Sequence, residues 1–528
     1  MADYNYYSKL SRAADVADKR DRLLYRFFEM LPGILAWLTL IAIFVFSFRL
    51  PTFMAIFIII FDVYWFIKTV YLSLHLRSAF RQVRQNMGIN WLERLTQLPT
   101  TNYQLPTVHS WHDIYHLVLL PMYKEPFETV DASIASLARA NYPQNKMIVV
   151  LAQEERAGEE FNREVASMLE AKYRDTFFKF VTVEHPGSIT GELAGKGSNI
   201  AYAGKWVKEN IIDPAGMSYE RIIVSALDID TVVFPEYFGR LAYVYLTAED
   251  PLHASYQPVP FYTNNIWEAP GFARVVAFSA TFWHTIKQER IESSTTFSSH
   301  SMPFQVLADI DFWQVNMVSE DSRIFWQAFL RYNGRYRNEP LFYPVSMDAN
   351  VAHSFRQTMI NVYKQQRRWG YGVENVPYFL FGFAKNKLIP LKKKLFMGFT
   401  ILESFWSWAT NAIIIFLLGW LPIALGGAEF NRTVLSYNLP FITRGIMTFA
   451  MVGLVSSVIL SMLILPPRPP RFGRHKYIFM IIQWALMPLT MILLGALPGL
   501  EAQSRLMLGK YMGFWVTPKG KQVLSSKQ

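Results

Sequence analysis

Residues 221–238 read RIIVSALDIDTVVFPEYF and predict a buried strand that ends in two carboxylates. The apolar run 222–226 is short and precedes turn residues, which is typical of a strand that a sheet buries on both faces. Asp228 and Asp230 follow it, and alternate strand residues share a face, so both side chains should point the same way. Two such carboxylates can hold a hard divalent cation. They can equally cap the turn to a helix that Pro235 marks.

Two earlier stretches predict strands of the same sheet: residues 116–126, HLVLLPMYKEP, and residues 146–156, KMIVVLAQEER. A helix-like segment separates them, and successive strand–helix units favour a parallel, doubly wound sheet. Ligands of such sheets collect at the carboxyl ends of the strands. The side chains that we expect there are Pro121, Tyr123, Glu125, Gln153 and Glu154.

Residues 191–207, GELAGKGSNIAYAGKWV, place a lysine between two glycines before a predicted helix. Lys196 and the backbone amides at the start of this helix, which Asn199 opens, can reach phosphate oxygens. An ordinary turn would use the same residues, so the motif is not specific by itself.

A third acidic motif, Ser319-Glu320-Asp321, follows an apolar and aromatic segment. A carboxylate at the mouth of a sheet that binds no metal suits a general base, which deprotonates a hydroxyl. The same residues could instead cap a helix, with Ser319 at its start and the acids in its first turn. Both roles are compatible.

Residues 361–372, NVYKQQRRWGYG, predict a helix with polar and aromatic groups one turn apart. Gln365 and Arg368 can bind phosphate oxygens, and the indole of Trp369 offers a flat face for a sugar ring. On a helix at a membrane surface this composition would be ordinary. Its position after the acidic motifs is what makes it informative.

The composition is that of a membrane protein with two or three bodies. The 528 residues are 52% hydrophobic and 18% charged, which excludes a disordered chain. The absence of cysteine excludes disulfide scaffolds, zinc–thiolate sites, iron–sulfur clusters and cysteine nucleophiles. The net charge of +11 comes from basic residues beside apolar runs, so we expect membrane lipids and no nucleic acid as partners.

Five apolar runs predict membrane-spanning helices: residues 31–48, 52–72, 401–425, 442–465 and 478–500. The second run follows the first at once, which argues against a cleaved signal peptide. Basic residues before the first run place the amino terminus and the α/β domain in the cytoplasm. A fifth simple crossing would put the basic tail outside. We therefore expect Pro488 or residues 495–498 to break the last run into a re-entrant hairpin.

These patterns divide the chain into seven parts. They are a cytoplasmic segment (1–30), two transmembrane helices (31–72), a juxtamembrane connector (73–110), an α/β domain (111–350), amphipathic interfacial helices (351–396), about three transmembrane helices (397–500) and a tail (501–528). Asp62 and Lys68 lie within the second span, where charges are costly. Either Asp62 pairs inside the bundle while Lys68 snorkels, or both form a polar wall for a hydrophilic product.

The motifs around residues 228–230, 319–321 and 365–369 resemble, in order and spacing, those of membrane-integrated family 2 glycosyltransferases. Cellulose, hyaluronan and chitin synthases belong to this family. Residues 514–520, FWVTPKG, look like the FxVTxKG gating loop of cellulose synthases. Residues 196–199 look like the family's KAGNxN segment.

The resemblance implies a GT-A domain that transfers a hexose from a nucleotide-diphosphate sugar, most often UDP-linked, with Mg2+ or Mn2+. Asp321 would be the base, with Glu320 beside it toward the acceptor, Asp230 and Asp228 would hold the metal, and Trp369 would bind the acceptor sugar. Family members invert the anomeric centre without a covalent intermediate. The residues implied to bind the nucleotide sugar are Pro121, Tyr123, Glu125, Glu154, Lys196, Asn199, Asp228, Gln365, Arg368, Thr517 and Lys519.

The chain departs from the family pattern in two places, of which the first leaves the nucleotide open. The family usually has Asp-Asp after its second strand, where this chain has residues 152–154, AQE, so UDP and GDP both stay possible. Ala201 stands where a second asparagine is common.

The function that these motifs favour is a processive polysaccharide synthase in the plasma (inner) membrane. The alternative enzyme adds one sugar to a lipid acceptor, and product length would separate the two. A catalytically silent membrane scaffold or transporter is a third reading, against which the intact Asp228, Asp230 and Asp321 argue. The motifs do not specify the sugar, the linkage or any accessory subunits.

Overall fold

The computed structural model describes residues 4–99 and 104–517. Its centre is an eight-stranded sheet with the strand order β3-β2-β1-β4-β7-β6-β8-β5. The strands are β1 (Tyr115–Met122), β2 (Met147–Glu154), β3 (Lys179–His185), β4 (Ile222–Ala226), β5 (Val232–Val233), β6 (Ala254–Phe261), β7 (His300–Pro303) and β8 (Arg337–Ser346).

The strand order reverses beside β1. The chain runs from β1 outward through β2 to β3, all parallel, and then returns to β4 on the other side of β1, again parallel. β7 is antiparallel to β4 and β6, whereas β6 and β8 are parallel. The loops after β1 and β4 therefore diverge at a switch point, which is where open α/β sheets bind ligands.

Helices cover both faces of this sheet because the central strands are apolar on both faces. Leu117 and Leu119 of β1 pack toward α7 and α11, whereas Val118 and Leu120 pack toward α5, α6 and α8. Burial of each such aliphatic side chain stabilises the folded state by about 1.5–3 kcal/mol relative to leaving it exposed. The helices of this domain are α5 (Phe127–Ala138), α6 (Glu159–Tyr173), α7 (Lys196–Val207), α8 (Tyr237–Thr247), α9 (Gly271–Glu289), α10 (Phe304–Ile310) and α11 (Glu320–Arg331).

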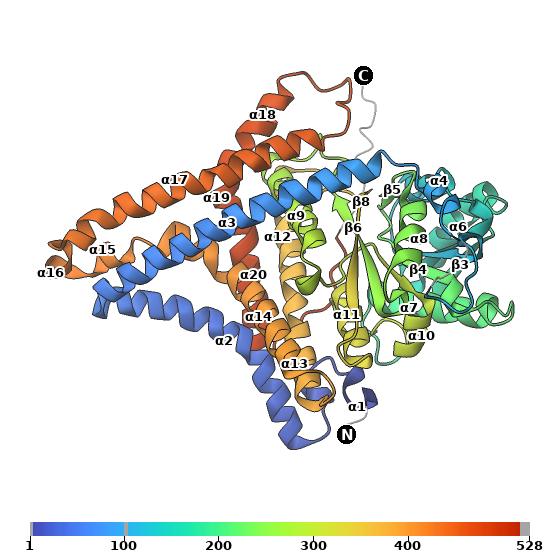
Figure 1. Ribbon diagram of the computed structural model, residues 1–528, viewed down its shortest axis with the longest axis horizontal. Coiled ribbons are helices and arrows are strands. Elements are labelled where there is room, and N and C mark those ends of the chain that lie inside the picture. The colour runs from blue at the N-terminus through green and yellow to red at the C-terminus, as the bar shows by residue number, and fades with distance from the viewer. Residues whose placement is uncertain (1–3, 100–103, 518–528) are drawn as a thin grey trace.

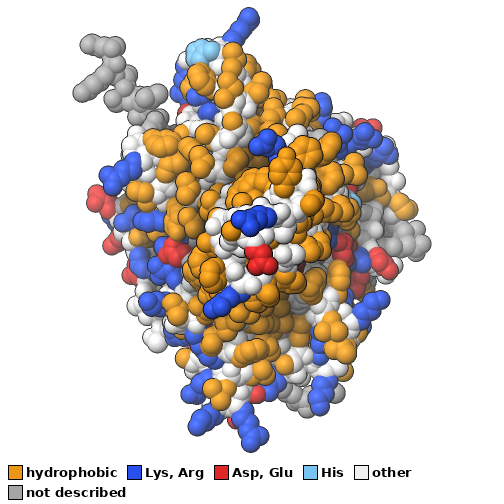
Figure 2. All heavy atoms as spheres, turned by 90° about the vertical axis from the view of Figure 1, so that its left-hand side faces the viewer, with side chains coloured by type: hydrophobic (Ala, Val, Ile, Leu, Met, Phe, Trp, Pro, Cys, Tyr) orange, Lys and Arg blue, Asp and Glu red, His pale blue; other side chains and the backbone are white. Residues whose placement is uncertain are grey.

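Within the described residues, five helical segments are long and apolar enough to cross a membrane. Figure 1 shows several of them extending to the left, away from the sheet domain at the right. Hydrophobic side chains dominate the end of this bundle (Figure 2). The segments are α2 (Lys19–Arg49), α3 (Pro51–Met87), α14 with η10 (Leu391–Leu418), α17 (Val434–Leu463), and the run Lys476–Met507.

Capping and proline residues set the bounds of these helices. The Asp18 side chain accepts a hydrogen bond from Asp21 N at the start of α2, and Pro51 opens α3 directly after the turn at Leu50. In the last segment Pro488 and Pro498 each sit in the first turn of a new helix. That segment comprises α18 (Lys476–Ile482), η11 (Gln483–Leu486), α19 (Met487–Met491), η12 (Ile492–Ala496) and α20 (Leu497–Met507).

The last apolar segment begins and ends on the side of the sheet domain. Before it, Trp267 Nε1 of the domain donates to Pro466 O at 3.2 Å. At its end, Arg26 Nη1 near the start of α2 donates to Leu506 O at 3.0 Å. Figure 1 shows α18, α19 and α20 running across the bundle, whereas α2, α3 and α17 point away from the sheet. The chain after α20 therefore stays beside the sheet domain.

Two helices connect the sheet domain with the bundle. α12 (Phe355–Gly370) and η9 (Tyr371–Glu374) lead into α13 (Asn375–Lys385), which packs against α2 and α11. Most side chains of α13 are buried, so this helix is enclosed by protein, not laid on lipid by itself. The remaining helices are α1 (Tyr4–Ser8), α4 (Trp91–Thr96), α15 (Leu421–Leu425) and α16 (Gly427–Asn431). The predicted combination of a mixed, mostly parallel α/β domain with a helical bundle is confirmed.

Candidate active site

The two aspartates after β4 are held by different partners. Asp228 Oδ1 lies 2.6 Å from Lys196 Nζ, and Asp228 Oδ2 accepts from Ser298 Oγ at 2.6 Å. Asp230 is buried, and its Oδ2 accepts from Asp348 N at 3.1 Å. Both side chains line the same cavity.

Lys196 joins two of the acidic motifs. It is the first residue of α7, and its ammonium lies 2.6 Å from Asp228 Oδ1 and 2.8 Å from Asp321 Oδ1. Burial by itself would lower the pKa of Lys196, but the two carboxylates raise it above its ordinary value. The lysine is therefore a permanent positive charge between Asp228 and Asp321. Ser298, which no sequence motif indicated, holds the other oxygen of Asp228 by its hydrogen bond.

Glycine is required where the chain's tail approaches α7. A Cβ on Gly195 would lie 2.7 Å from Phe514 Cγ, and one on Gly197 would lie 2.9 Å from Glu320 Cβ. The glycines thus allow both the tail and the start of α11 to approach Lys196 closely.

Glu320 and Asp321 begin α11 but differ in environment. Glu320 is 2% exposed, and burial together with the neighbouring charge of Asp321 raises its pKa well above the ordinary value. Asp321 O accepts from Thr296 Oγ1 at 2.6 Å, which holds its backbone. His300 Nδ1 lies 3.8 Å from Asp321 Oδ1, and burial lowers the pKa of His300, so it stays neutral. Of these two neighbouring acids, Asp321 is the one whose carboxylate contacts Lys196.

The carboxyl ends of β1 and β2 form the next wall of the cavity. Pro121, Tyr123, Glu125 and Glu154 line it beside Asn199 of α7, whereas the expected Gln153 is buried away from the cavity and its Nε2 donates to Asn162 O at 3.0 Å. Tyr123 N donates to Glu125 Oε2 at 2.8 Å, and Asn199 Nδ2 donates to Ala152 O at 2.8 Å.

Glu154 is the centre of a charged cluster in this wall. Its Oε2 accepts from Arg156 Nε at 3.1 Å and lies 3.3 Å from His185 Nδ1. His185 Nε2 lies 2.8 Å from Glu192 Oε2. Glu154 Oε1 is buried and lacks a hydrogen-bond partner among the described residues, as does Asn199 Oδ1. Arg156 could have been found from its position after Glu154, whereas His185 carries no sequence signal.

The helix α12 supplies the opposite wall. Arg368 lies over the Phe514 ring, 4.9 Å from its centroid, and the rings of Trp369 and Tyr262 are 6.1 Å apart. Thr517 is buried beside them, with its Oγ1 unpartnered in the described part of the chain. Lys519 lies outside the described residues. The tail and α12 thus meet at the cavity.

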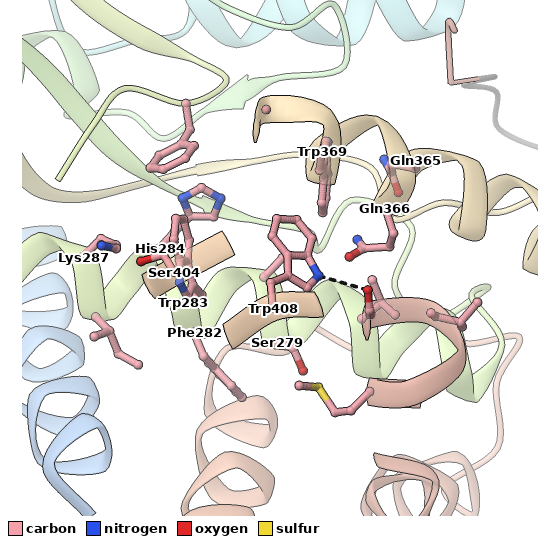
Figure 3. A pocket seen from close by; sticks show the side chains of 18 of the residues that line it. Ser279, Phe282, Trp283, His284, Lys287, Gln365, Gln366, Trp369, Ser404 and Trp408 are labelled. Carbon is pink, nitrogen blue, oxygen red and sulfur yellow. Dashed lines mark hydrogen bonds between the residues drawn. The ribbon is translucent and has the colours of Figure 1, made fainter. Parts of the chain in front are cut away.

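One cavity of about 2120 Å³ brings the predicted residues together and continues into the bundle. The predicted site residues that line it are Pro121, Tyr123, Glu125, Glu154, Lys196, Asn199, Asp228, Asp230, Glu320, Asp321, Gln365, Arg368, Trp369 and Thr517. In Figure 3, Trp408 of α14 lies below Trp369 and beside Gln366, and its Nε1 donates to Gly495 O at 3.1 Å. No sequence motif indicated Trp408.

The bundle part of the cavity contains an ion pair. Lys68 Nζ of α3 lies 2.6 Å from Glu403 Oε1 of α14, and Ser407 Oγ donates to the same oxygen at 2.6 Å. Lys68 therefore pairs across the cavity instead of snorkelling to the surface. Asp62 also lines the cavity. The two charges that the sequence placed in this span thus face the interior of the protein.

The carboxylates at the end of β4 fit a hard divalent cation only in part. Asp228 and Asp230 offer oxygen ligands beside the Asp348 backbone. Among the described residues, no group of three or more His, Asp and Glu side chains is arranged to hold a metal. A cation here would need further oxygen ligands from a bound diphosphate and from water.

Comparisons with known proteins find similarity in structure alone. No protein-family model matches the chain. No curated protein matches it in sequence. One similar structure is the mannosyltransferase PcManGT from Pyrobaculum calidifontis in complex with GDP-Man and Mn2+, at 12% identity and a TM-score of 0.38, covering 75% of this chain and 99% of that chain. Another is S. aureus TarS 1-349 in complex with UDP-GlcNAc, at 13% identity and a TM-score of 0.36, covering 65% and 91%.

Proposed function

We propose that this protein is a membrane-integrated glycosyltransferase that extends a polysaccharide from a nucleotide-diphosphate sugar and passes the product through its own bundle. The observation that carries the proposal is the cavity, which joins Asp228 and Asp321 to the interior of the membrane helices. A hydrophilic chain made at the sheet edge would have a continuous path into the bundle. We place the sheet domain on the cytoplasmic side of the plasma (inner) membrane. Basic residues precede the first span, and such residues collect on the cytoplasmic side. Two spans then return the chain to that side before the sheet domain begins.

The donor would lie along the carboxyl ends of β1, β2 and β4. The unpartnered Glu154 Oε1 and Asn199 Oδ1 are acceptors suited to the N–H groups of a nucleobase, uracil or guanine. Lys196 and the start of α7 would face the diphosphate, and Gln365 and Arg368 would approach it from α12. Thr517 brings the tail to the same place.

Asp321 would act as the general base. It would take the proton from the acceptor hydroxyl while that oxygen forms a bond to the anomeric carbon and the carbon–oxygen bond to the diphosphate breaks. The nucleoside diphosphate leaves, and the single displacement inverts the anomeric centre. Burial and the neighbouring Asp321 raise the pKa of Glu320, which favours its protonated form, and in that form it would donate a hydrogen bond toward the acceptor.

Mg2+ or Mn2+ fits this scheme as a shared ligand. Asp230, with Asp228 beside it, would hold the cation, and a bound cation would neutralise charge on the diphosphate leaving group. Lys196 supplies positive charge at the same place from the chain itself.

The acceptor would enter the bundle between aromatic rings. Trp369 and Trp408 line successive parts of the cavity (Figure 3), and indole faces stack on sugar rings. The Lys68–Glu403 pair and Ser407 add polar groups further along the cavity. This sequence of groups favours a sugar chain over a single small acceptor.

A second candidate, transfer of one sugar to a lipid acceptor, is favoured by a different observation. Much of the bundle part of the cavity is lined by apolar side chains, which suit an acyl or isoprenoid chain. They include Phe396, Phe399, Ile401, Phe405, Ile415 and Phe416.

Nucleoside-diphosphate release by the purified, detergent-solubilised protein tests the proposal. UDP- and GDP-sugars are supplied with Mg2+ or Mn2+, the product is sized, and Asp321→Asn runs in parallel. Release from one donor that Asp321→Asn loses, with a long product, supports the synthase. A product with one added sugar selects the lipid-acceptor enzyme. Absence of both donor binding and release would overturn the proposal in favour of a silent scaffold.

A further inference from the structure

The turn that carries the base is held from the opposite wall of the cavity. Ser319 occupies the N-cap position of α11, but its hydroxyl makes no cap bond to α11 itself. Instead Ser319 Oγ donates to Glu374 Oε1 at 2.8 Å. Glu374 belongs to η9, directly after the helix that carries Arg368 and Trp369. The Ser319 hydroxyl therefore links the start of α11 to η9 instead of capping α11.

Three donors converge on this one carboxylate oxygen. Val318 N lies 3.0 Å and Ser319 N 2.8 Å from Glu374 Oε1, in addition to the Ser319 hydroxyl. Hydrogen bonds to a carboxylate are stronger than neutral ones, and burial strengthens them further. Glu374 is 6% exposed. The backbone directly before Glu320 and Asp321 is therefore fixed relative to η9.

Arg323 supports the same arrangement one turn into α11. It is fully buried, its Nη2 donates to Glu374 O at 3.1 Å, and its Nε donates to Asn375 Oδ1 at 2.6 Å. Its Nη1 donates to Leu10 O at 2.9 Å, which adds the amino-terminal segment to the assembly. The α11 helix is thus tied to η9 at two successive turns.

Glu374 does not face the substrate space. Among the described residues that line the cavity are Ser319, Gly372 and Asn375, but not Glu374. It can act on the reaction only through the groups that it holds. A displacement of about 1 Å at a reacting group can cost a factor of about 10² in rate.

We infer that Glu374 is a positioning residue, which sets the distance between the base Asp321 and the acceptor groups on α12 through its bonds to the backbone of residues 318–319. This inference rests on the proposed function. It predicts a fault in the transfer step and not in donor binding, because Lys196, Asp228 and the β1 and β2 ends do not contact Glu374.

Glu374→Gln is the first test, because it keeps the size and one acceptor oxygen but removes the charge. We expect kcat to fall about tenfold and the donor KM to stay within about twofold. Glu374→Ala should lose about 10² in kcat. Ser319→Ala, which removes one of the three donors and keeps the backbone bonds, should show a smaller loss of the same kind. Glu159→Gln, at an 86% exposed side chain, is the matched control.

The double variant Asp321→Asn/Glu374→Gln separates positioning from general support of the fold. If Glu374 acts through Asp321, the double variant is no slower than Asp321→Asn alone. Wild-type kcat in Glu374→Gln, a full additional loss in the double variant, or a donor KM that rises together with a lower melting temperature would each overturn the inference. If the wild-type protein transfers no sugar, the proposed function fails. If it transfers and only Asp321→Asn is impaired, the inference alone fails.

Discussion

At the sheet end of the cavity the charged groups touch one another, whereas at the bundle end one ion pair stands among aromatic and aliphatic side chains. Lys196 contacts Asp228 and Asp321 within 2.8 Å, and Glu154, Arg156 and His185 form a second cluster nearby. In the bundle, Lys68 and Glu403 bridge α3 and α14. The sheet end is therefore suited to a charged ligand that replaces these pairings. The bundle end is lined mostly by apolar side chains around the Lys68–Glu403 pair.

Removing Asp321, the base that we propose at the sheet end, should have the largest effect. Asp321→Asn keeps the size of the side chain, so donor binding should persist while transfer falls by a factor of about 10² or more. Single-turnover transfer and donor titration measure the two quantities. Asp213→Asn, at an exposed aspartate paired with Lys208, is the control. Transfer at the wild-type rate would remove Asp321 from the mechanism.

Lys196→Met should weaken donor binding about ten- to a hundredfold, because it removes the ammonium that offsets the charges of Asp228 and Asp321 beside the proposed diphosphate site. Isothermal titration with UDP and GDP measures this loss. Lys208→Met, at the surface end of the same helical segment, should bind the nucleotide as the wild type does. An unchanged affinity in Lys196→Met would contradict the assignment of the diphosphate to this end.

Lys68→Met tests whether the two ends are separable. It leaves Glu403 unpaired, and since the two side chains are 19% and 21% exposed, the loss should be about 1–3 kcal/mol of stability, seen as a lower melting temperature. The double variant Lys68→Met/Glu403→Met should recover most of it. Donor affinity should stay at the wild-type value in both. A changed donor affinity would show that the bundle and the sheet end act as one unit.

The smallest expected effect is a pH dependence from His185. Burial by itself would lower the pKa of His185, but Glu154 and Glu192 on its two ring nitrogens raise it above the ordinary value. Its stabilising contribution is therefore complete below the unfolded pKa and is lost as the pH rises through the folded pKa.

The melting temperature of the wild type relative to His185→Gln should consequently be highest near about pH 6 and decline toward about pH 8. We propose that the nucleobase binds beside Glu154, so donor affinity measured over the same pH range tests that proposal. Parallel melting curves of the two proteins at every pH would rule out a charged His185 in the folded state.

Particular residues show how much of the site the sequence could predict. The apolar run 222–226 predicted the strand, and Asp228 and Asp230 lie in the turn directly after β4, which ends at Ala226, so the period of the strand does not set their directions. The residues Ser298 and Thr296, which hold Asp228 and Asp321, lie in a loop without a motif. Trp408 looked like any aromatic residue of a membrane helix. Its position below Trp369 follows from the packing of α20 against both α12 and α14.

The sequence by itself determined the strands around the switch point, the apolar helices, and the three motifs that carry carboxylates, arginine and tryptophan. Each depends on neighbours within about ten residues, so periodicity and turn chemistry reveal it. Only the tertiary structure decided that Lys196 lies between Asp228 and Asp321, that Phe514 of the tail lies against Arg368, and that Glu374 accepts hydrogen bonds from residues 318 and 319 before Asp321. These contacts join segments far apart in the chain, and their geometry depends on how whole helices pack.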